Sequence, residues 1–430
     1  MKKNLFLLSL TLIAIVFLGA CTNANQPDEN NADLEEFDVI ELEFWHAMAG
    51  PHEVAVEALI ERFHLEHPHI RINHSFQGSY TDLNTLITSS ALAGTLPHIG
   101  QQTTDHITNY VNDGILIPLT PFFTELPESD VNDIVEVFRN GIVWNDEFYS
   151  VPFGKSTRVL YVNLDLLAAY DLEIPTTWDE VIHIAHVLRD AHENRFGMGF
   201  ENSWAAEFVA LTIQHGGMYI DESTATAVFA NSGGIEAASF IMDLYENDYA
   251  RFAGEDNFLS GIFGNGVLGM YIGTSSSFPH VTAAVDGDFE WTTAVLPTYN
   301  GNAASRFHGN DLVMFDNGMT DAEQQAVWEF MTFVLRPEEN AQFAVDSGFI
   351  PVRYAAHTHT IWENFIEANP HAAAGALQFD SGFITARVPG ASESWQILTE
   401  ELTNIRLGLY DVEAALTRAQ ERINEVLDRY

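Results

Sequence analysis

The chain has little cysteine and little positive charge, and both shortages limit what it can be. Its 430 residues include one cysteine, which excludes a disulfide framework and cysteine-based zinc sites within the chain. It carries 18 Lys and Arg against 61 Asp and Glu, a formal net charge of −43. Nucleic acids and anionic lipids both require clustered positive charge. Neither is therefore expected as a surface-wide partner.

Common catalytic and nucleotide-binding motifs are missing as well. The spacings G-x-S-x-G, H-E-x-x-H and the P-loop do not occur. Residues 264–269 spell G-x-G-x-x-G but lack the strand and helix that a dinucleotide site needs. We therefore predict no cofactor, and no familiar motif indicates an enzyme. The alternative is a surface glycan or diester hydrolase that uses two of the many carboxylates as acid and base.

Four histidines, His64, His67, His69 and His74, gather in the segment FHLEHPHIRINH. A helix is expected to end near His67, and the spacing across that boundary matches no familiar set of metal ligands. The chain has 17 histidines. We interpret these four as polar surface residues and predict no metal site.

The chain nevertheless has ample material for a folded core. Hydrophobic residues make up 47% and aromatic residues 12% of it, which argues against disorder. A chain of this length is expected to form about two to three domains.

The single cysteine, Cys21, stands at the end of a secretory signal pattern. Two lysines precede an apolar stretch at residues 5–17, which is too short to span a bilayer. Leu18-Gly19-Ala20-Cys21 resembles the bacterial lipobox, in which the cysteine becomes the acylated first residue. We expect a signal peptide at 1–20, an acidic tether at 21–37, and a protein anchored outside the cell membrane as a lipoprotein.

After the tether, strand and helix patterns alternate. Residues 38–44 and 70–76 show period two, and residues 54–63 and 83–92 show helical spacing. This order predicts an α/β layer with a parallel sheet.

The same theme returns after residue 150. A short strand is predicted at 159–162, and Thr177 to Glu180 have the spacing of a capping box before a helix. Further helices are predicted at 234–247, 321–335 and 412–427. Two α/β lobes explain this better than one large sheet.

Several short motifs, in this order, are similar to those of family 1 extracellular solute-binding proteins. They are Phe44-Trp45-His46, Phe76-Gln77-Gly78-Ser79-Tyr80, residues 151–157 (VPFGKST), Thr177-Trp178-Asp179-Glu180 and residues 347–352 (SGFIPV). The nearest branch binds sn-glycerol-3-phosphate and its diesters.

The resemblance implies a two-lobed α/β fold, periplasmic-binding-protein-like, with a ligand cleft between the lobes. We expect lobe 1 at 38–150 plus about 300–350, and lobe 2 at 151–299 plus about 351–430. It also implies a non-enzymatic component of an ABC importer that captures a small solute and presents it to a membrane permease. Closure around the ligand would follow from contacts made by both lobes.

The branch's binding residues carry over in part. Those that match are Tyr80, Ser156, Trp204, Thr274 and Gly309. Three positions depart: Thr104 replaces an acid, Phe349 a tyrosine and Trp395 an arginine, although Arg387 lies eight residues before Trp395. Both a glycerol phosphate and a neutral carbohydrate therefore remain open as ligands.

Lys155 is the only lysine after the predicted signal peptide. It lies in the 151–157 segment, which the resemblance makes a loop at the cleft. We predict that it supplies a positive charge for a phosphate or carboxylate. The alternative is a solvated surface lysine.

Overall fold

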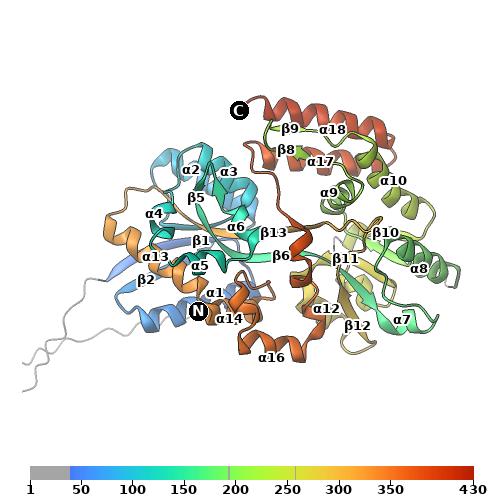
Figure 1. Cartoon of the computed structure of the whole chain (residues 1–430), viewed down its shortest axis with the longest axis horizontal. Coiled ribbons are helices and arrows are strands. Elements are labelled where there is room, and N and C mark those ends of the chain that lie inside the picture. The colour runs from blue at the N-terminus through green and yellow to red at the C-terminus, as the bar shows by residue number, and fades with distance from the viewer. Residues whose placement is uncertain (1–38, 192–193, 257) are drawn as a thin grey trace, which may run out of the picture. The chain divides into compact units, whose positions relative to one another are not determined.

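The computed structural model describes residues 39–191, 194–256 and 258–430, and residues 39–430 form one compact unit (Figure 1). Cys21, the predicted signal peptide (1–20) and the predicted tether (21–37) lie outside the described residues. No helix among the described residues is long and apolar enough to cross a membrane.

A large mixed sheet runs through this unit in the order β11-β6-β13-β3-β1-β2, with β12 paired to β6 and β14 to β13. The strands are β1 (Ile40–His46), β2 (Ile70–Phe76), β3 (Ile99–Thr103), β6 (Ser150–Asn163), β11 (Met270–Thr274), β12 (Trp291–Ala294), β13 (Ser305–Met314) and β14 (Gly382–Phe383).

Three strands of the sheet fulfil the parallel prediction. β1 pairs in parallel with both β2 and β3, and the alternation in β1 buries Leu42 and Phe44 while Glu41 and Glu43 face solvent. β13 is antiparallel to β3 and β6, and β6 is antiparallel to β11 and β12, so the prediction of a parallel sheet holds only for β1–β3 and for the short β13–β14 pair.

The strand β6 differs most from the prediction. The expected loop at 151–157 and the short strand at 159–162 form one continuous strand, Ser150–Asn163. Its first half pairs with β13, and its second half pairs with β11 and β12. Pro152 has no N–H to donate to a neighbouring strand, but it lies where the register of β13 shifts between Asn310 and Asp311, and the strand continues past it.

The two largest hydrophobic cores among the described residues both include side chains of this sheet. The first core contains side chains from β1, α1 (Pro51–Glu66) and α13 (Asp321–Leu335). The second core contains side chains from the second half of β6, α8 (Trp178–Ala191) and α18 (Val412–Leu427), among others. The exact lobe boundaries stay a prediction.

The other longer helices are amphipathic or buried. They are α2 (Tyr80–Ala93), α3 (Thr104–Asn112), α9 (Ala205–Gln214), α10 (Ser232–Glu246), α12 (Phe278–Val285), α14 (Pro337–Ser347), α16 (Thr360–Ala368) and α17 (Ala391–Arg406). Two of them, α2 and α10, confirm the helices predicted at 83–92 and 234–247 within a few residues.

Shorter elements fill the connections. They are α4 (Thr120–Phe123), α5 (Glu128–Asn132), α6 (Glu136–Gly141), β4 (Val143–Trp144), β5 (Glu147–Phe148), α7 (Leu164–Ala168), β7 (Met198–Phe200), β8 (Ile220–Asp221), β9 (Thr226–Ala227), β10 (Ala250–Phe252), α11 (Ser260–Gly264), α15 (Tyr354–His357) and the 3-10 turns η1 (Gly254–Asp256), η2 (Ser275–Ser277), η3 (Pro370–Ala372) and η4 (Ala376–Ser381).

Local signals account well for helix starts. The Thr320 hydroxyl accepts from the Glu323 amide while the Glu323 carboxylate accepts from Thr320, which is the capping box that opens α13. The Thr177 hydroxyl likewise accepts from the Glu180 amide at α8.

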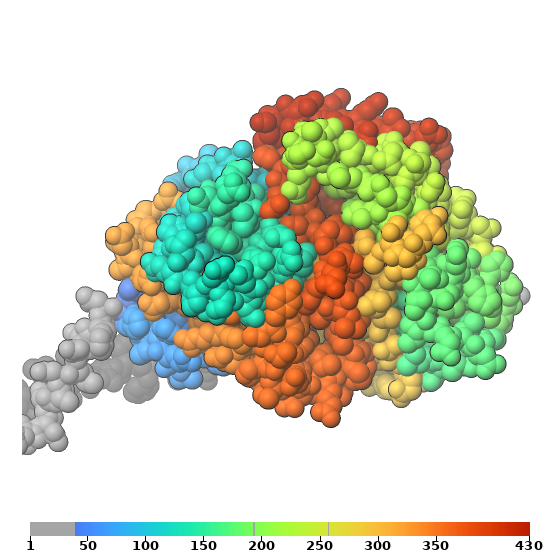
Figure 2. All heavy atoms as spheres, in the orientation of Figure 1, coloured from blue at the N-terminus to red at the C-terminus, as the bar shows by residue number. Residues whose placement is uncertain are grey.

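On the face seen in Figure 2, the orange-to-red segment between α14 and α17 lies between blue-green and green parts of the chain.

Candidate functional site

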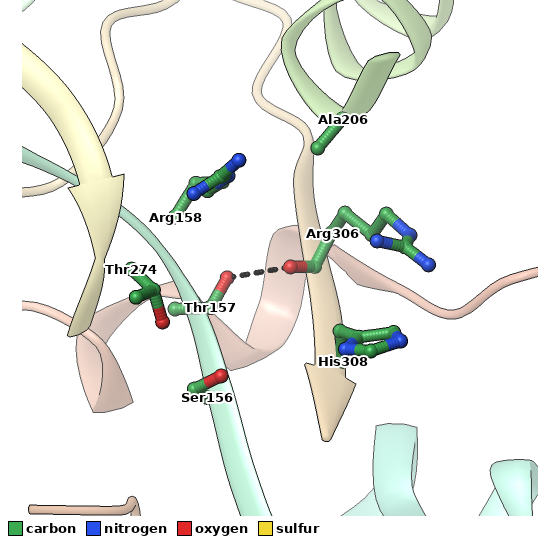
Figure 3. Close-up of a pocket in the computed structure, with 7 residues that line it drawn as sticks. All are labelled: Ser156, Thr157, Arg158, Ala206, Thr274, Arg306 and His308. Carbon is green, nitrogen blue, oxygen red and sulfur yellow. Dashed lines mark hydrogen bonds between the residues drawn. The ribbon is translucent and has the colours of Figure 1, made fainter. Parts of the chain in front are cut away.

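A pocket opens where β6 changes partner from β13 to β11. Its volume is about 250 Å³. Its lining comes from four elements that are far apart in the sequence (Figure 3): Ser156, Thr157, Arg158, Ala206, Thr274, Arg306 and His308. The lining combines three hydroxyls, two guanidinium groups and one imidazole, which suits a small solute with several oxygens.

The alternation of side chains along β13 determines where Arg306 and His308 point. Arg306 and His308 are two residues apart and project to the same side of the strand (Figure 3), while Phe307 between them packs into the first core. The Thr157 hydroxyl donates to the Arg306 carbonyl oxygen at 3.0 Å, which ties β6 to β13 at the pocket wall.

The two arginines differ in their partners. Arg158 forms two ion pairs: its Nη1 lies 2.9 Å from Glu201 Oε2, and its Nε lies 2.9 Å from Glu207 Oε1. Burial raises the pKa of Glu207, and Arg158 acts against that rise. This group therefore brings little free positive charge to the pocket.

Arg306 has no carboxylate in an ion pair among the described residues. Its Nε and Nη2 donate to the Thr385 hydroxyl at 3.2 and 2.6 Å. Its Cζ lies 3.9 Å from the centroid of the Trp395 ring. Burial lowers the pKa of Arg306 to about 10, while the more distant Asp105 acts in the other direction. The guanidinium is therefore charged at neutral pH and can accept an anionic partner.

His308 is the neutral member of the pocket. Burial, and then the charge of Arg306, lower its pKa from 6.5 to about 3. Its imidazole can therefore donate one hydrogen bond and accept another at neutral pH.

The depressed pKa of His308 predicts a loss of stability in acid. Below pH 6.5 the unfolded chain takes up a proton at this residue, whereas the folded chain takes it up only near pH 3. The free energy of unfolding should therefore fall as pH drops through this window, by up to about 1.4 kcal/mol per pH unit for one group. Urea unfolding of His308→Gln should show a shallower fall than wild type, and the exposed control His183→Gln should not.

A second pocket of about 170 Å³ adjoins the first through Arg306, which lines both. It is more apolar, and its aromatic walls are Tyr219, Phe383 and Trp395. The charged pocket and the aromatic pocket together form a candidate site for a solute with a polar and a less polar end.

The structure places three sequence-predicted residues in these two pockets. Ser156 and Thr274 line the charged pocket, and Trp395 lines the aromatic one. The Thr274 hydroxyl accepts from the Ser276 amide, so it also caps the short η2 turn. That these residues bind ligand stays a prediction.

Lys155 was predicted in a loop, and this is wrong. It lies within β6, and 4% of it is exposed. Its Nζ lies 2.7 Å from Asp311 Oδ1, and the Asp311 side chain is fully buried. Thr104 lies beside the same carboxylate. Lys155 is thus an internal counter-ion for Asp311, and the solvated-surface alternative is wrong as well.

Tyr80 and Gly309 lie next to this buried pair but do not line either pocket. The Asn310 side-chain amide donates to the Tyr80 hydroxyl at 2.9 Å. Gly309 has a φ of 133°, and a Cβ there would lie 2.0 Å from the Gly154 carbonyl oxygen. Only glycine allows β13 to approach β6 this closely. Ligand contacts by Tyr80, Thr104 and Gly309 stay predictions.

The remaining predicted residues, Trp204, Phe349 and Arg387, do not line the charged pocket. Trp204 is 1% exposed and packs edge-on against Phe208 in the second core, and Phe349 is 7% exposed in the first. Arg387 donates to the Asn140 and Val143 carbonyl oxygens and lines a different polar pocket. For these residues the geometry favours a role in the fold.

Sequence reasoning missed the two β13 side chains, Arg306 and His308. The only signal was a pair of polar residues two apart, just before Gly309, and it did not stand out because the same segment also contains Ser305, Asn310 and Asp311. Their pairing with residues 156–158 depends on strand register, which no local pattern revealed.

The comparisons with known proteins agree with this architecture. The sn-glycerol-3-phosphate-binding periplasmic protein UgpB of Pectobacterium atrosepticum is 23% identical over 421 residues, covering 91% of this chain and 92% of that protein. UgpB from Mycobacterium tuberculosis, solved in complex with glycerophosphocholine, superimposes with a TM-score of 0.79 at 22% identity, covering 90% of this chain and 98% of that one.

The sugar-binding protein MalE from Xanthomonas citri has a TM-score of 0.80 at 21% identity, covering 90% of this chain and 98% of that one. These structural likenesses establish the two-lobed binding-protein fold. The relatives are solute-binding proteins and give no support to the hydrolase alternative. A family model described as bacterial extracellular solute-binding protein matches residues 58–374, and the chain therefore belongs to that family.

Proposed function

We propose that this protein is the lipid-anchored solute-binding component of an ABC importer, and that it captures a glycerol phosphate or one of its diesters. The observation that carries the proposal is Arg306, a partly buried guanidinium in the pocket wall that forms no ion pair with a carboxylate of the described residues. In a protein of charge −43, an anionic solute needs such a local positive charge. The relative solved with glycerophosphocholine supports the same class of ligand.

In this proposal the phosphate lies against Arg306, with the hydroxyls of Ser156 and Thr274 as further partners. The alcohol part of a diester extends into the aromatic pocket, toward Trp395. Charged hydrogen bonds and stacking then act on opposite ends of one solute.

A carbohydrate is the second candidate. The aromatic walls of the second pocket offer faces on which sugar rings stack, and the fold is shared with the sugar-binding protein MalE. The two candidates differ in charge, so they are separable by experiment.

The test is thermal unfolding in the presence of glycerol-3-phosphate, glycerophosphocholine and maltose. A ligand at one hundred times its Kd adds about 2.7 kcal/mol of stability. We expect stabilisation by the two phosphates. Stabilisation by maltose alone would favour the carbohydrate, and turnover of any of these compounds would contradict the binding role.

The lipid anchor has its own test. Cys21 lies outside the described residues, and the proposal rests on the lipobox-like Leu18-Gly19-Ala20-Cys21. Acyl chains contribute about 0.8 kcal/mol per buried CH₂ to membrane attachment. Cys21→Ser should therefore move the protein from the membrane fraction to the soluble fraction while its melting temperature stays the same. An unchanged membrane fraction in cells would show that the anchor proposal is wrong.

A further inference from the structure

Two histidines and a glutamate meet on the surface of the first core, away from both pockets. His67 ends α1, His69 lies just before β2, and Glu329 lies in α13. One donor atom from each lies within 4.8 Å of the other two. We propose that these three residues form a binding site for a divalent transition-metal ion of the zinc class.

The distances come close to those of a tetrahedral site. Ligands about 2.0–2.1 Å from zinc at tetrahedral angles lie about 3.3 Å from one another. His67 Nδ1 lies 3.2 Å and His69 Nε2 lies 3.7 Å from Glu329 Oε2. The two histidine nitrogens lie within 4.8 Å of each other, so binding requires the imidazoles to approach each other while both remain near Glu329.

The packing around the cluster holds His67 in place and leaves the outer side open. The His67 ring stacks on Phe63, with centroids 4.4 Å apart and an interplanar angle of 14°. The His67 side chain is 18% exposed, Glu329 33% and His69 44%. An ion can enter from solvent, with water in the fourth position.

The other two histidines of the FHLEHPHIRINH segment do not belong to this cluster. His64 Nε2 accepts from the Ile72 amide at 2.9 Å, and His74 Nδ1 lies 3.1 Å from His46 Nε2. The spacing of the histidines therefore did not indicate this site, because its third ligand, Glu329, lies 262 positions after His67.

The alternative interpretation is that no metal binds here and that His67 simply forms a hydrogen bond with Glu329. Two imidazoles converging on one carboxylate oxygen favour the metal, because His69 lies beyond hydrogen-bond distance from Glu329 yet within a few tenths of an ångström of the separation expected for two metal ligands. A bound ion would join the α1–β2 turn to α13 and should raise the melting temperature.

The test is calorimetric titration of the untagged full chain with zinc, alongside thermal unfolding with and without zinc. The variants are His69→Gln and Glu329→Gln. The control is His183→Gln, which removes an exposed histidine of α8. His67 is left in place because its ring packs on Phe63.

We expect wild type and His183→Gln to share one tightest zinc site, and both test variants to bind at least about tenfold more weakly there. Zinc should raise the melting temperature of the first two proteins more than that of the variants. Equal zinc affinity in His69→Gln and the control, or no saturable site in wild type, would overturn the proposal.

Discussion

Replacing Lys155 with methionine is expected to lower the free energy of unfolding by about 3–5 kcal/mol, because it leaves a buried charge without its partner. The Lys155 Nζ to Asp311 Oδ1 distance is 2.7 Å, and the two side chains are 5% and 0% exposed. Burial already raises the pKa of Asp311, and Lys155 acts against this rise. Without the lysine, Asp311 must be protonated or remain as an isolated buried anion.

The pH dependence follows from the raised pKa of Asp311. A carboxyl with a raised pKa in the folded state favours folding at low pH and loses that contribution as pH increases. The deficit of Lys155→Met should therefore be smaller at pH 5 than at pH 7 in urea unfolding. The double variant Lys155→Met with Asp311→Asn should recover part of it. A deficit below about 1 kcal/mol, as for an exposed ion pair, would contradict this assignment.

Replacing Arg306 with methionine should weaken binding of glycerol-3-phosphate by about 1.5–3 kcal/mol, which is the usual effect of losing a charged hydrogen bond. In affinity this is roughly ten- to more than a hundredfold. Arg306 lines both pockets and forms no ion pair among the described residues. Maltose binding should change less and should be insensitive to salt.

Calorimetry at two salt concentrations measures this effect. The matched control is Arg71→Met, which removes an exposed arginine of β2. Because Arg306 also contacts Thr385 and Trp395, the melting temperature without ligand must be measured as well. Equal affinity for glycerol-3-phosphate in Arg306→Met and Arg71→Met would contradict the proposed phosphate contact.

Much of the fold could be predicted from local signals. The capping box at Thr320 and the apolar spacing at 412–427 both gave the observed helix bounds, since these patterns depend on neighbours within a few residues. β6 could not be predicted in the same way. Pro152 resembles a turn residue, and only the shifted register opposite Asn310 and Asp311 makes it compatible with a strand.

The site was less predictable, for a related reason. Ser156 and Thr274 were found through motifs, but Arg306 meets them only because β6 pairs with both β13 and β11. The scarcity of lysine drew attention to Lys155. A residue's rarity does not tell whether its side chain faces solvent or a buried carboxylate such as Asp311. Strand register decides this, and it is a long-range property.

The most direct test of the central claim is a crystal structure of the protein with glycerophosphocholine. The account predicts ligand density between Arg306, Ser156 and Thr274, with the phosphate against the guanidinium and the choline toward Trp395. Ligand density at another place on the chain, with only solvent between these residues, would contradict it.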